Sequence, residues 1–299
     1  MRRVLVTGAG GFIGRPVCRD LGAAGWEVIG TGRSAKPADF GEGHWLPANL
    51  LDEVEANRLV KSAHATHLLH LAWVTDHGAF WTSPENQPWL AASKELFRAF
   101  AAQGGRRIIA AGTCAEYDWT APDPAAAPPN PTTAYGRAKL ALHDWAENFC
   151  RDSQISFAWG RVFFAFGPRE NSRRLVPYVI NQLLRADPVL CASGIGERDF
   201  LYVDDLARLF AVLVAGDYSG AYDLGAGRGL TIRHLVEALA RLAGRPDLPK
   251  FGARPDPVGE PGRLVARCLV PDIAIDANFP APLDQSLQRT LEWWRQTTR

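Results

Sequence analysis

A tyrosine and a lysine four positions apart are the residues of this sequence best suited to proton chemistry. Tyr135 and Lys139 fall within the segment 133–151, whose apolar spacing predicts a helix. Residues four apart share one helical face, so the Lys139 ammonium can stabilise a Tyr135 phenolate and lower its pKa from about 10. A tyrosine in this setting can exchange a proton with a carbonyl or an alcohol. The pair is therefore a candidate acid–base couple.

A threonine stands just ahead of this pair, where a predicted strand ends. The segment Arg107–Ala111 predicts a strand, and Gly112-Thr113-Cys114 follows it directly. At the carboxyl end of a parallel strand, a threonine hydroxyl faces the crevice in which α/β proteins bind their ligands. Thr113 is therefore a further candidate for the same site.

A glycine-rich turn links the first predicted strand, Val4–Thr7, to a predicted helix over 12–24. Gly8 allows a tight turn, Gly11 lacks a Cβ where a pyrophosphate must approach, and Gly14 allows close packing of helix on strand. The positive end of the helix dipole favours the phosphate charge. This context predicts dinucleotide binding. The expected contacts are Gly8, Gly11, Phe12, Ile13 and Gly14.

The end of the second predicted strand bears on the choice of cofactor. An NAD site usually places an acidic residue there to bind the ribose hydroxyls. This chain instead reads Gly30-Thr31-Gly32-Arg33, with Lys36 close behind. Arg33 can pair with the 2′-phosphate of NADP. NADP(H) is therefore the preferred cofactor, and NAD(H) stays open.

Strands alternate with helices through the first half of the chain, which predicts an α/β fold with a doubly wound, Rossmann-type parallel sheet. Pro84 after Ser83 predicts a helix start there, and Asp204 or Asp205 and Thr231 are candidate caps of two later helices. We expect a dinucleotide-binding domain over 1–165, with a returning segment near 198–225. A smaller α/β region over 166–299 would bind the substrate.

Composition narrows the possible partners. Lys plus Arg number 33 and Asp plus Glu 32, a net charge of +1, so neither nucleic acid nor membrane is expected as a partner. The 5 cysteines are scattered without a C-x-x-C pair, which predicts neither disulfides nor a metal site and suits a reducing cytosol. No apolar run approaches the roughly 20 residues of a bilayer span, and no secretory signal is recognisable. We expect a soluble, cytoplasmic protein.

The order of glycine loop, strand-end threonine and Y-x-x-x-K, with a divergent C-terminal half, resembles the extended short-chain dehydrogenase/reductase family. The segment 198–205, Arg-Asp-Phe-Leu-Tyr-Val-Asp-Asp, is similar to the family signature R-D-F-V-Y-V-D-D. His70-Leu71-Ala72 and the segment 161–169 add further matches, so the resemblance covers essentially the whole chain. It implies a Rossmann-type cofactor domain, a nucleotide-sugar substrate and a homodimer.

The resemblance also implies roles for individual residues. Tyr135 would donate or accept the proton, Lys139 would lower its pKa and hold the nicotinamide ribose, and Thr113 would orient the substrate oxygen. Further cofactor contacts would come from Asn49, Leu50, Leu71 and Ala72, and substrate contacts from Trp73, His77, Arg198 and Arg254.

Departures from the family pattern limit the reactions that this chain could catalyse. Sugar-nucleotide 4,6-dehydratases carry an Asp-Glu pair directly after the strand-end threonine, whereas this chain has Cys114 and Ala115. We interpret Cys114 as a small buried residue. Chemistry that needs only the triad remains, and NADPH-dependent reduction of a 4-keto-deoxy sugar nucleotide fits best. An NAD-dependent 4-epimerase and a non-catalytic NADP-sensing protein stay open. A reductase of a non-sugar carbonyl also stays open, favoured by Phe164 where the family has Asn.

Overall fold

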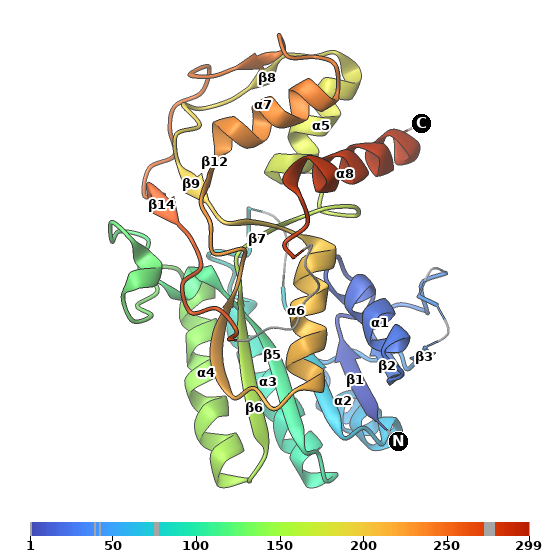
Figure 1. Cartoon of the computed structure of the whole chain (residues 1–299). Coiled ribbons are helices and arrows are strands. Elements are labelled where there is room, and N and C mark those ends of the chain that lie inside the picture. Colours follow the sequence, from blue (N-terminus) through green and yellow to red (C-terminus); the bar gives the residue numbers. More distant parts are fainter. Residues whose placement is uncertain (1, 39, 42, 75–77, 272–278, 299) are drawn as a thin grey trace.

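The computed structural model describes residues 2–38, 40–41, 43–74, 78–271 and 279–298. A seven-stranded parallel sheet in the order β11-β6-β5-β4-β1-β2-β3 forms its centre (Figure 1). This is the strand order of the doubly wound Rossmann fold with one strand added, so the predicted fold class is confirmed. The strands are β1 (Arg3–Thr7), β2 (Glu27–Thr31), β3 (His44–Trp45), β4 (His67–His70), β5 (Arg107–Thr113), β6 (Ser156–Val162) and β11 (Gly220–Leu224).

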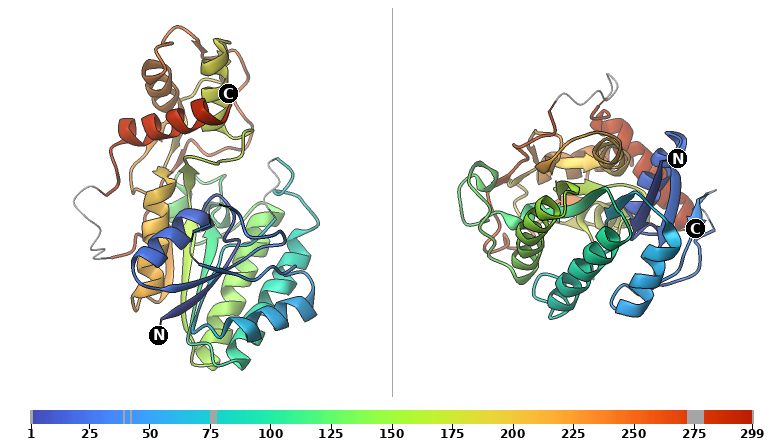
Figure 2. Two further views of the ribbon diagram at one scale, coloured as in Figure 1. Left: turned by 90° about the vertical axis from the view of Figure 1, so that its right-hand side faces the viewer. Right: turned by 90° about the horizontal axis from the view of Figure 1, so that it is seen from below.

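Helices cover both faces of this sheet. The helices α1 (Gly14–Ala23) and α6 (Val203–Ala215) pack on one face, and α2 (Glu53–Ala63), α3 (Asn86–Ala102) and α4 (Ala134–Asp152) lie side by side on the other (Figure 2). Side chains alternate along a strand, so each strand supplies both layers. Val4 and Val6 share a buried cluster with α1 and α6, while Leu5 between them packs with α2, α3 and α4.

A smaller region lies beyond the carboxyl ends of the sheet strands (Figure 1). Its apolar core joins α5 (Leu175–Arg185), α7 (Ile232–Leu242) and α8 (Leu283–Thr297). Within the described ranges, short strands form three small sheets outside the central one. They are β7 (Phe164–Phe166) with β10 (Phe200–Tyr202), β9 (Glu197–Arg198) with β12 (Leu230–Thr231) and β14 (Arg263–Leu264), and β8 (Val189–Leu190) with β13 (Pro249–Lys250).

Two predicted helix starts are wrong, for identifiable reasons. Helix α3 begins at Asn86, not at Ser83-Pro84, because the Asn86 side-chain amide donates to the carbonyls of Phe80 and Ser83 and closes a turn there. Helix α6 begins at Val203 without a side-chain cap.

The two acidic residues expected to cap α6 instead lie in its first turn. Asp204 pairs with Arg19 of α1, and Asp205 accepts the backbone N–H of Ala281. The predicted cap of α7 is confirmed, since the Thr231 hydroxyl accepts the His234 N–H at 3.1 Å.

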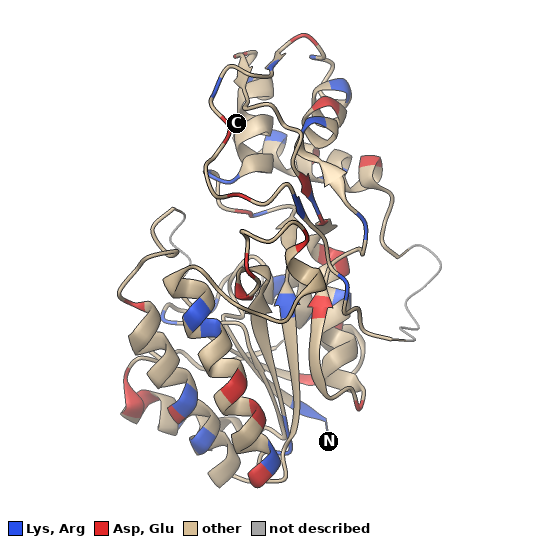
Figure 3. Ribbon diagram, turned by 90° about the vertical axis from the view of Figure 1, so that its left-hand side faces the viewer, with Lys and Arg blue, Asp and Glu red and all other residues tan. Residues whose placement is uncertain are grey.

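Charges of both signs are mixed over the layer of α3 and α4 (Figure 3). Among the helices that the structure describes, none is both long enough and apolar enough for a membrane crossing.

Candidate active site

The three predicted catalytic side chains come together where the end of β5 meets α4. Thr113 is the last residue of β5, and its side chain interacts with the Tyr135 phenol. Lys139 lies one helical turn beyond Tyr135, and its Nζ donates to the carbonyl of Ala111 at 2.9 Å. The strand thus supplies a partner to each of the two helical side chains.

Local sequence explains why α4 starts where it does. The Thr133 hydroxyl accepts the Gly136 N–H at 3.0 Å and caps the helix, so Tyr135 falls in its first turn. A Cβ at Gly136 would lie 2.1 Å from the carbonyl oxygen of Ala115, in the 3-10 turn η1 (Cys114–Glu116) after β5. Glycine therefore lets the helix approach the strand end closely.

The pKa shift of Tyr135 beside Lys139 is opposite in direction to the one expected from the sequence. Burial lowers the pKa of Lys139 to about 7, and its Nζ lies 4.0 Å from the centre of the Trp73 ring. Burial also raises the pKa of Tyr135 above its usual value, although the interaction with the Thr113 side chain opposes the rise. The expected lowering of the Tyr135 pKa by Lys139 is therefore wrong for this structure. The raised pKa favours the neutral phenol of Tyr135, the form that donates a proton.

An aromatic wall encloses the Tyr135 ring. Phe80 and Trp81 meet it edge to face, with ring centres 4.9 and 5.8 Å away, and the Tyr135 N–H donates to the Trp81 carbonyl. Trp119 continues the wall, 5.3 Å from Trp81. Trp73 is buried under Lys139, where its indole N–H donates to Asn86. The surface around the phenol is therefore largely apolar.

The glycine-rich turn has the geometry that a dinucleotide diphosphate needs. Gly8 has a left-handed φ of +67°, and a Cβ there would lie 3.0 Å from the backbone nitrogen of Ala72. A Cβ at Gly14 would lie 2.2 Å from the Gly8 carbonyl, and one at Gly11 would lie 3.1 Å from the same atom. Phe12 and Ile13 lead from this turn into α1. The turn thus fits a bound dinucleotide at the start of α1.

Residues after β4 hold the opposite side of this turn. The Thr7 hydroxyl accepts the backbone N–H groups of Leu71 and Ala72 at 3.1 and 3.2 Å, and bonds to Nδ1 of His70. Burial and the charge of Lys139 lower the His70 pKa to about 3, so its ring stays neutral. His70 thereby links β1 to Ser93 of α3.

At the end of β2, Arg33 is exposed, and the residues from Thr31 to 38 include no acid. The Lys36 ammonium donates to the Gly43 carbonyl at 2.9 Å. Asn49 is exposed and closes a turn before α2 by accepting the Leu51 N–H, and Leu50 is buried. Between Thr31 and residue 38 the charged side chains are those of Arg33 and Lys36.

The predicted substrate contacts are more dispersed. Arg198 is buried, and its guanidinium donates to Glu260 and to the carbonyl of Pro261, both at 2.8 Å. It also lies over the Phe164 ring. Arg254 is exposed and bonds to the Tyr178 hydroxyl of α5. His77 lies outside the described residues.

The interpretation of Cys114 as a buried residue is confirmed. Its side chain is buried, and burial raises the pKa of the thiol to about 12. Ala115 beside it has no polar side-chain group, so the turn after Thr113 offers no acid–base pair. Across the described part of the chain, no three His, Cys, Asp or Glu side chains gather as metal ligands.

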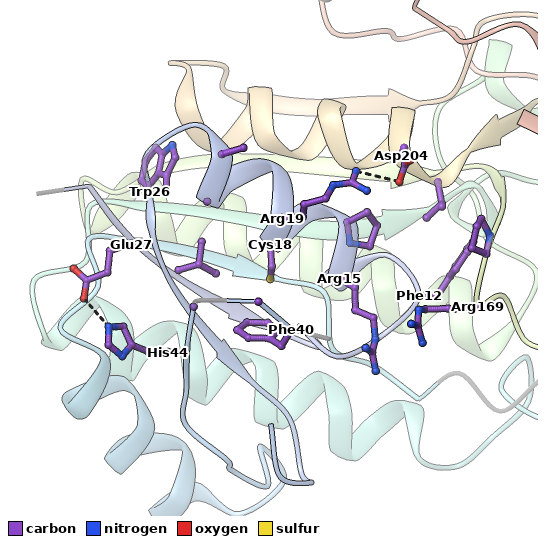
Figure 4. A pocket seen from close by; sticks show the side chains of 18 of the residues that line it. Phe12, Arg15, Cys18, Arg19, Trp26, Glu27, Phe40, His44, Arg169 and Asp204 are labelled. Atoms are coloured by element: carbon purple, nitrogen blue, oxygen red, sulfur yellow. Dashed lines mark hydrogen bonds and ion pairs between the residues drawn. The ribbon is translucent and has the colours of Figure 1, made fainter. Parts of the chain in front are cut away.

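A cavity of about 670 Å³ lies outside the triad, along α1. Figure 4 shows Arg15 and Arg169 beside Phe12 at one end, and Trp26, Glu27 and His44 at the other. It begins at the helix terminus where the diphosphate is expected and does not include the catalytic side chains.

Two structural partners of the site escaped the prediction. Glu116 ends η1 and is completely buried, and Arg161 of β6 pairs with it at 2.7 Å. The spacing from Thr113 to Glu116 is that of a capping box, a signal present in the sequence. The pairing with Arg161 depends on β5 and β6 being neighbours, which no local pattern encodes.

Residues 4–225 match the family model described as NAD dependent epimerase/dehydratase family. The match spans well over half of the chain, so this protein belongs to that enzyme family. The resemblance found in the sequence is confirmed.

Individual relatives agree with this assignment. UDP-glucose 4-epimerase of Streptomyces lividans is 27% identical over 294 residues, covering 88% of this chain and 87% of that protein. The structure of UDP-glucose 4-epimerase from Thermotoga maritima with UDP-glucose has a TM-score of 0.83 at 22% identity, covering 99% and 100% of the two chains. UDP-glucose 4-epimerase of Thermus thermophilus with NAD gives 0.80 at 22% identity, covering 98% and 99%. The structural likeness establishes a shared fold.

Proposed function

We propose that this protein is an NADP(H)-dependent oxidoreductase that reduces the 4-keto group of a deoxy-sugar nucleotide. The observation that carries the proposal is the meeting of Thr113, Tyr135 and Lys139 where β5 ends, at a turn that carries Cys114 and Ala115 in place of an acid–base pair. A carbonyl oxygen bound by Thr113 and Tyr135 would receive the phenolic proton. Bound NADPH supplies the hydride to the carbonyl carbon. Elimination of water would need an acid–base pair that this turn does not offer.

The rim of the glycine-rich turn supports NADP(H) over NAD(H). Arg33 follows β2 where NAD enzymes usually carry an acid, and the Nε of Arg15 donates to the Gly10 carbonyl at 2.8 Å beside the same turn. Both guanidinium groups suit the charge of a 2′-phosphate.

The aromatic wall supports a sugar with an apolar edge. Phe80, Trp81 and Trp119 present ring surface beside Tyr135, where the methyl group of a 6-deoxy sugar would avoid water. Arg198 would bind the diphosphate by exchanging its Glu260 partner for the substrate. We also propose a homodimer through α3 and α4, where Trp145 and Phe149 stack at the surface.

A second candidate is a UDP-sugar 4-epimerase, because the curated relatives carry that activity in their names. Epimerisation uses the same triad but keeps NAD bound through the turnover. The two candidates therefore differ in cofactor and in net reaction.

Thermal unfolding with NAD, NADH, NADP and NADPH separates them, each measured with and without UDP, GDP, CDP or dTDP. Ligands that bind the native state raise the melting temperature. We expect the largest rise with NADPH, increased further by one nucleotide, and a shift toward NAD in Arg33→Asp. A rise with NAD alone, unaltered in Arg33→Asp, would contradict the reductase and favour the epimerase.

A further inference from the structure

A buried carboxylate directly behind the catalytic turn takes no part in the proposed chemistry. Oε1 of Glu116 accepts the backbone N–H of Thr113 at 2.8 Å, and Oε2 accepts Nε of Arg161 at 2.7 Å. The indole nitrogen of Trp159 lies 3.1 Å from both oxygens. Glu116 is completely buried, and burial raises the pKa of its carboxyl group, whereas the Arg161 charge and the hydrogen bond from the Thr113 N–H oppose this rise.

The backbone on both sides of this carboxylate is tightly packed. A Cβ at Gly112 would lie 2.6 Å from Oε1 of Glu116. The turn that Glu116 ends is also the turn that a Cβ at Gly136 would strike, at the Ala115 carbonyl. Glu116 thus ties down a turn that lies between the strand carrying Thr113 and the helix carrying Tyr135.

From Arg161, further contacts lead away from the catalytic side chains toward β11. The Arg161 guanidinium lies over the Tyr117 ring, and the Tyr117 hydroxyl donates to Asp223 of β11 at 2.7 Å. Asp223 in turn accepts the backbone N–H groups of Arg267 and Cys268. The carboxylate is therefore anchored to the outer strands of the sheet and to the segment that returns from the smaller region.

We propose that Glu116 is a positioning residue whose carboxylate fixes the turn after β5, so that the Thr113 hydroxyl stays against Tyr135. The inference rests on the proposed acid–base role of this pair.

The charge of Glu116 also acts on the lysine of the triad. Its attraction raises the pKa of Lys139 and partly offsets the lowering by burial. Other charged or titratable groups around the two side chains are Arg161 on β6, Cys114 and Tyr117 beside Glu116, Tyr135 and His143 on α4, and His70 on β4.

Glu116→Gln in the full chain tests the proposal, because it keeps the side-chain size and removes the charge. We expect kcat for the proposed reduction to fall about tenfold while NADPH affinity is retained. We also expect the Lys139 titration to move down by about one pH unit. Carbon-13 NMR of protein labelled at the lysine Cε reads that titration without turnover, and Lys139→Arg assigns the signal.

The matched control is Asp205→Asn, which alters another buried carboxylate that accepts a backbone N–H, on α6. It should reduce stability and leave the Lys139 titration unchanged. Glu116→Asp, which keeps the charge, should preserve the titration while kcat falls, and it carries the test if Glu116→Gln does not fold.

A kcat that is unaltered in both Glu116 variants would overturn the proposal. A Lys139 titration that is the same in Glu116→Gln as in the wild type would overturn the accompanying claim that the Glu116 charge acts on Lys139. Failure of the proposed function is distinguishable, because it would appear as no oxidation of NADPH by the wild type, or as retained turnover in Tyr135→Phe. The NMR titration would still report on Glu116 in that case.

Discussion

Lys139→Met should stabilise the ligand-free protein while abolishing turnover. Burial lowers the Lys139 pKa from 10.5 to about 7, so the folded state disfavours the ammonium form. At about 1.4 kcal/mol for each pH unit, this corresponds to a penalty of about 5 kcal/mol below pH 7. Loss of the hydrogen bond to Ala111 and of the contact with Trp73 offsets about 1 kcal/mol each, leaving about 3 kcal/mol of net stabilisation.

The pH dependence of this difference identifies its cause. Between the folded pKa of about 7 and the unfolded value of 10.5, the unfolded chain holds a proton that the folded chain has released. Wild-type stability should therefore rise with pH across this window, and the advantage of Lys139→Met should shrink. The thiols of Cys18, Cys114 and Cys150, whose pKa values burial raises to about 12, are common to both proteins and cancel in the difference.

Urea unfolding at several pH values from 6 to 10 measures the difference, with circular dichroism as the signal. Lys61→Met, at an exposed position on α2, controls for the loss of a positive charge. A stability difference that does not vary with pH, or one that matches Lys61→Met, would refute a buried lysine with a lowered pKa.

Two further predictions concern the glycine-rich turn and Arg198. Gly14→Ala should cost about 3 kcal/mol in urea unfolding and weaken cofactor binding, because the new Cβ would meet the Gly8 carbonyl at 2.2 Å. Gly22→Ala on the same helix meets nothing within 4 Å and should stabilise by about 0.5 kcal/mol; equal effects would refute the steric reasoning. Glu260→Gln should lower the KM for an anionic substrate about threefold at low salt, since Arg198 loses a competing carboxylate. An unchanged or higher KM in steady-state assays would exclude that competition.

The sequence predicted most of the architecture because its signals are local. Alternating apolar segments indicated the sheet and the two helical layers, and the glycine spacing located the turn between β1 and α1. The wrong helix starts depend on side-chain contacts that apolar spacing and capping preferences do not encode. The start of α3 depends on the Asn86 amide closing a turn onto Phe80, and the acids of α6 are taken by Arg19 and by the backbone of Ala281.

The candidate site likewise contains features that the sequence predicted and features that it did not. Thr113, Tyr135 and Lys139 were found because strand ends and helical spacing are short-range features. The sequence did not predict that the Lys139 ammonium contacts Ala111 and Trp73. These contacts depend on how α4 packs against β5 and the segment after β4. Burial then dominates the electrostatics of the pair, and burial is set by the whole fold.

The most direct test of the account follows NADPH absorbance with a 4-keto-6-deoxy sugar nucleotide, for wild type and Tyr135→Phe. The account predicts oxidation of NADPH in step with substrate reduction by the wild type. It predicts a loss of about 1000-fold in kcat for Tyr135→Phe, with NADPH affinity retained. Turnover by Tyr135→Phe at a rate close to that of the wild type would contradict the central claim that this phenol supplies the proton.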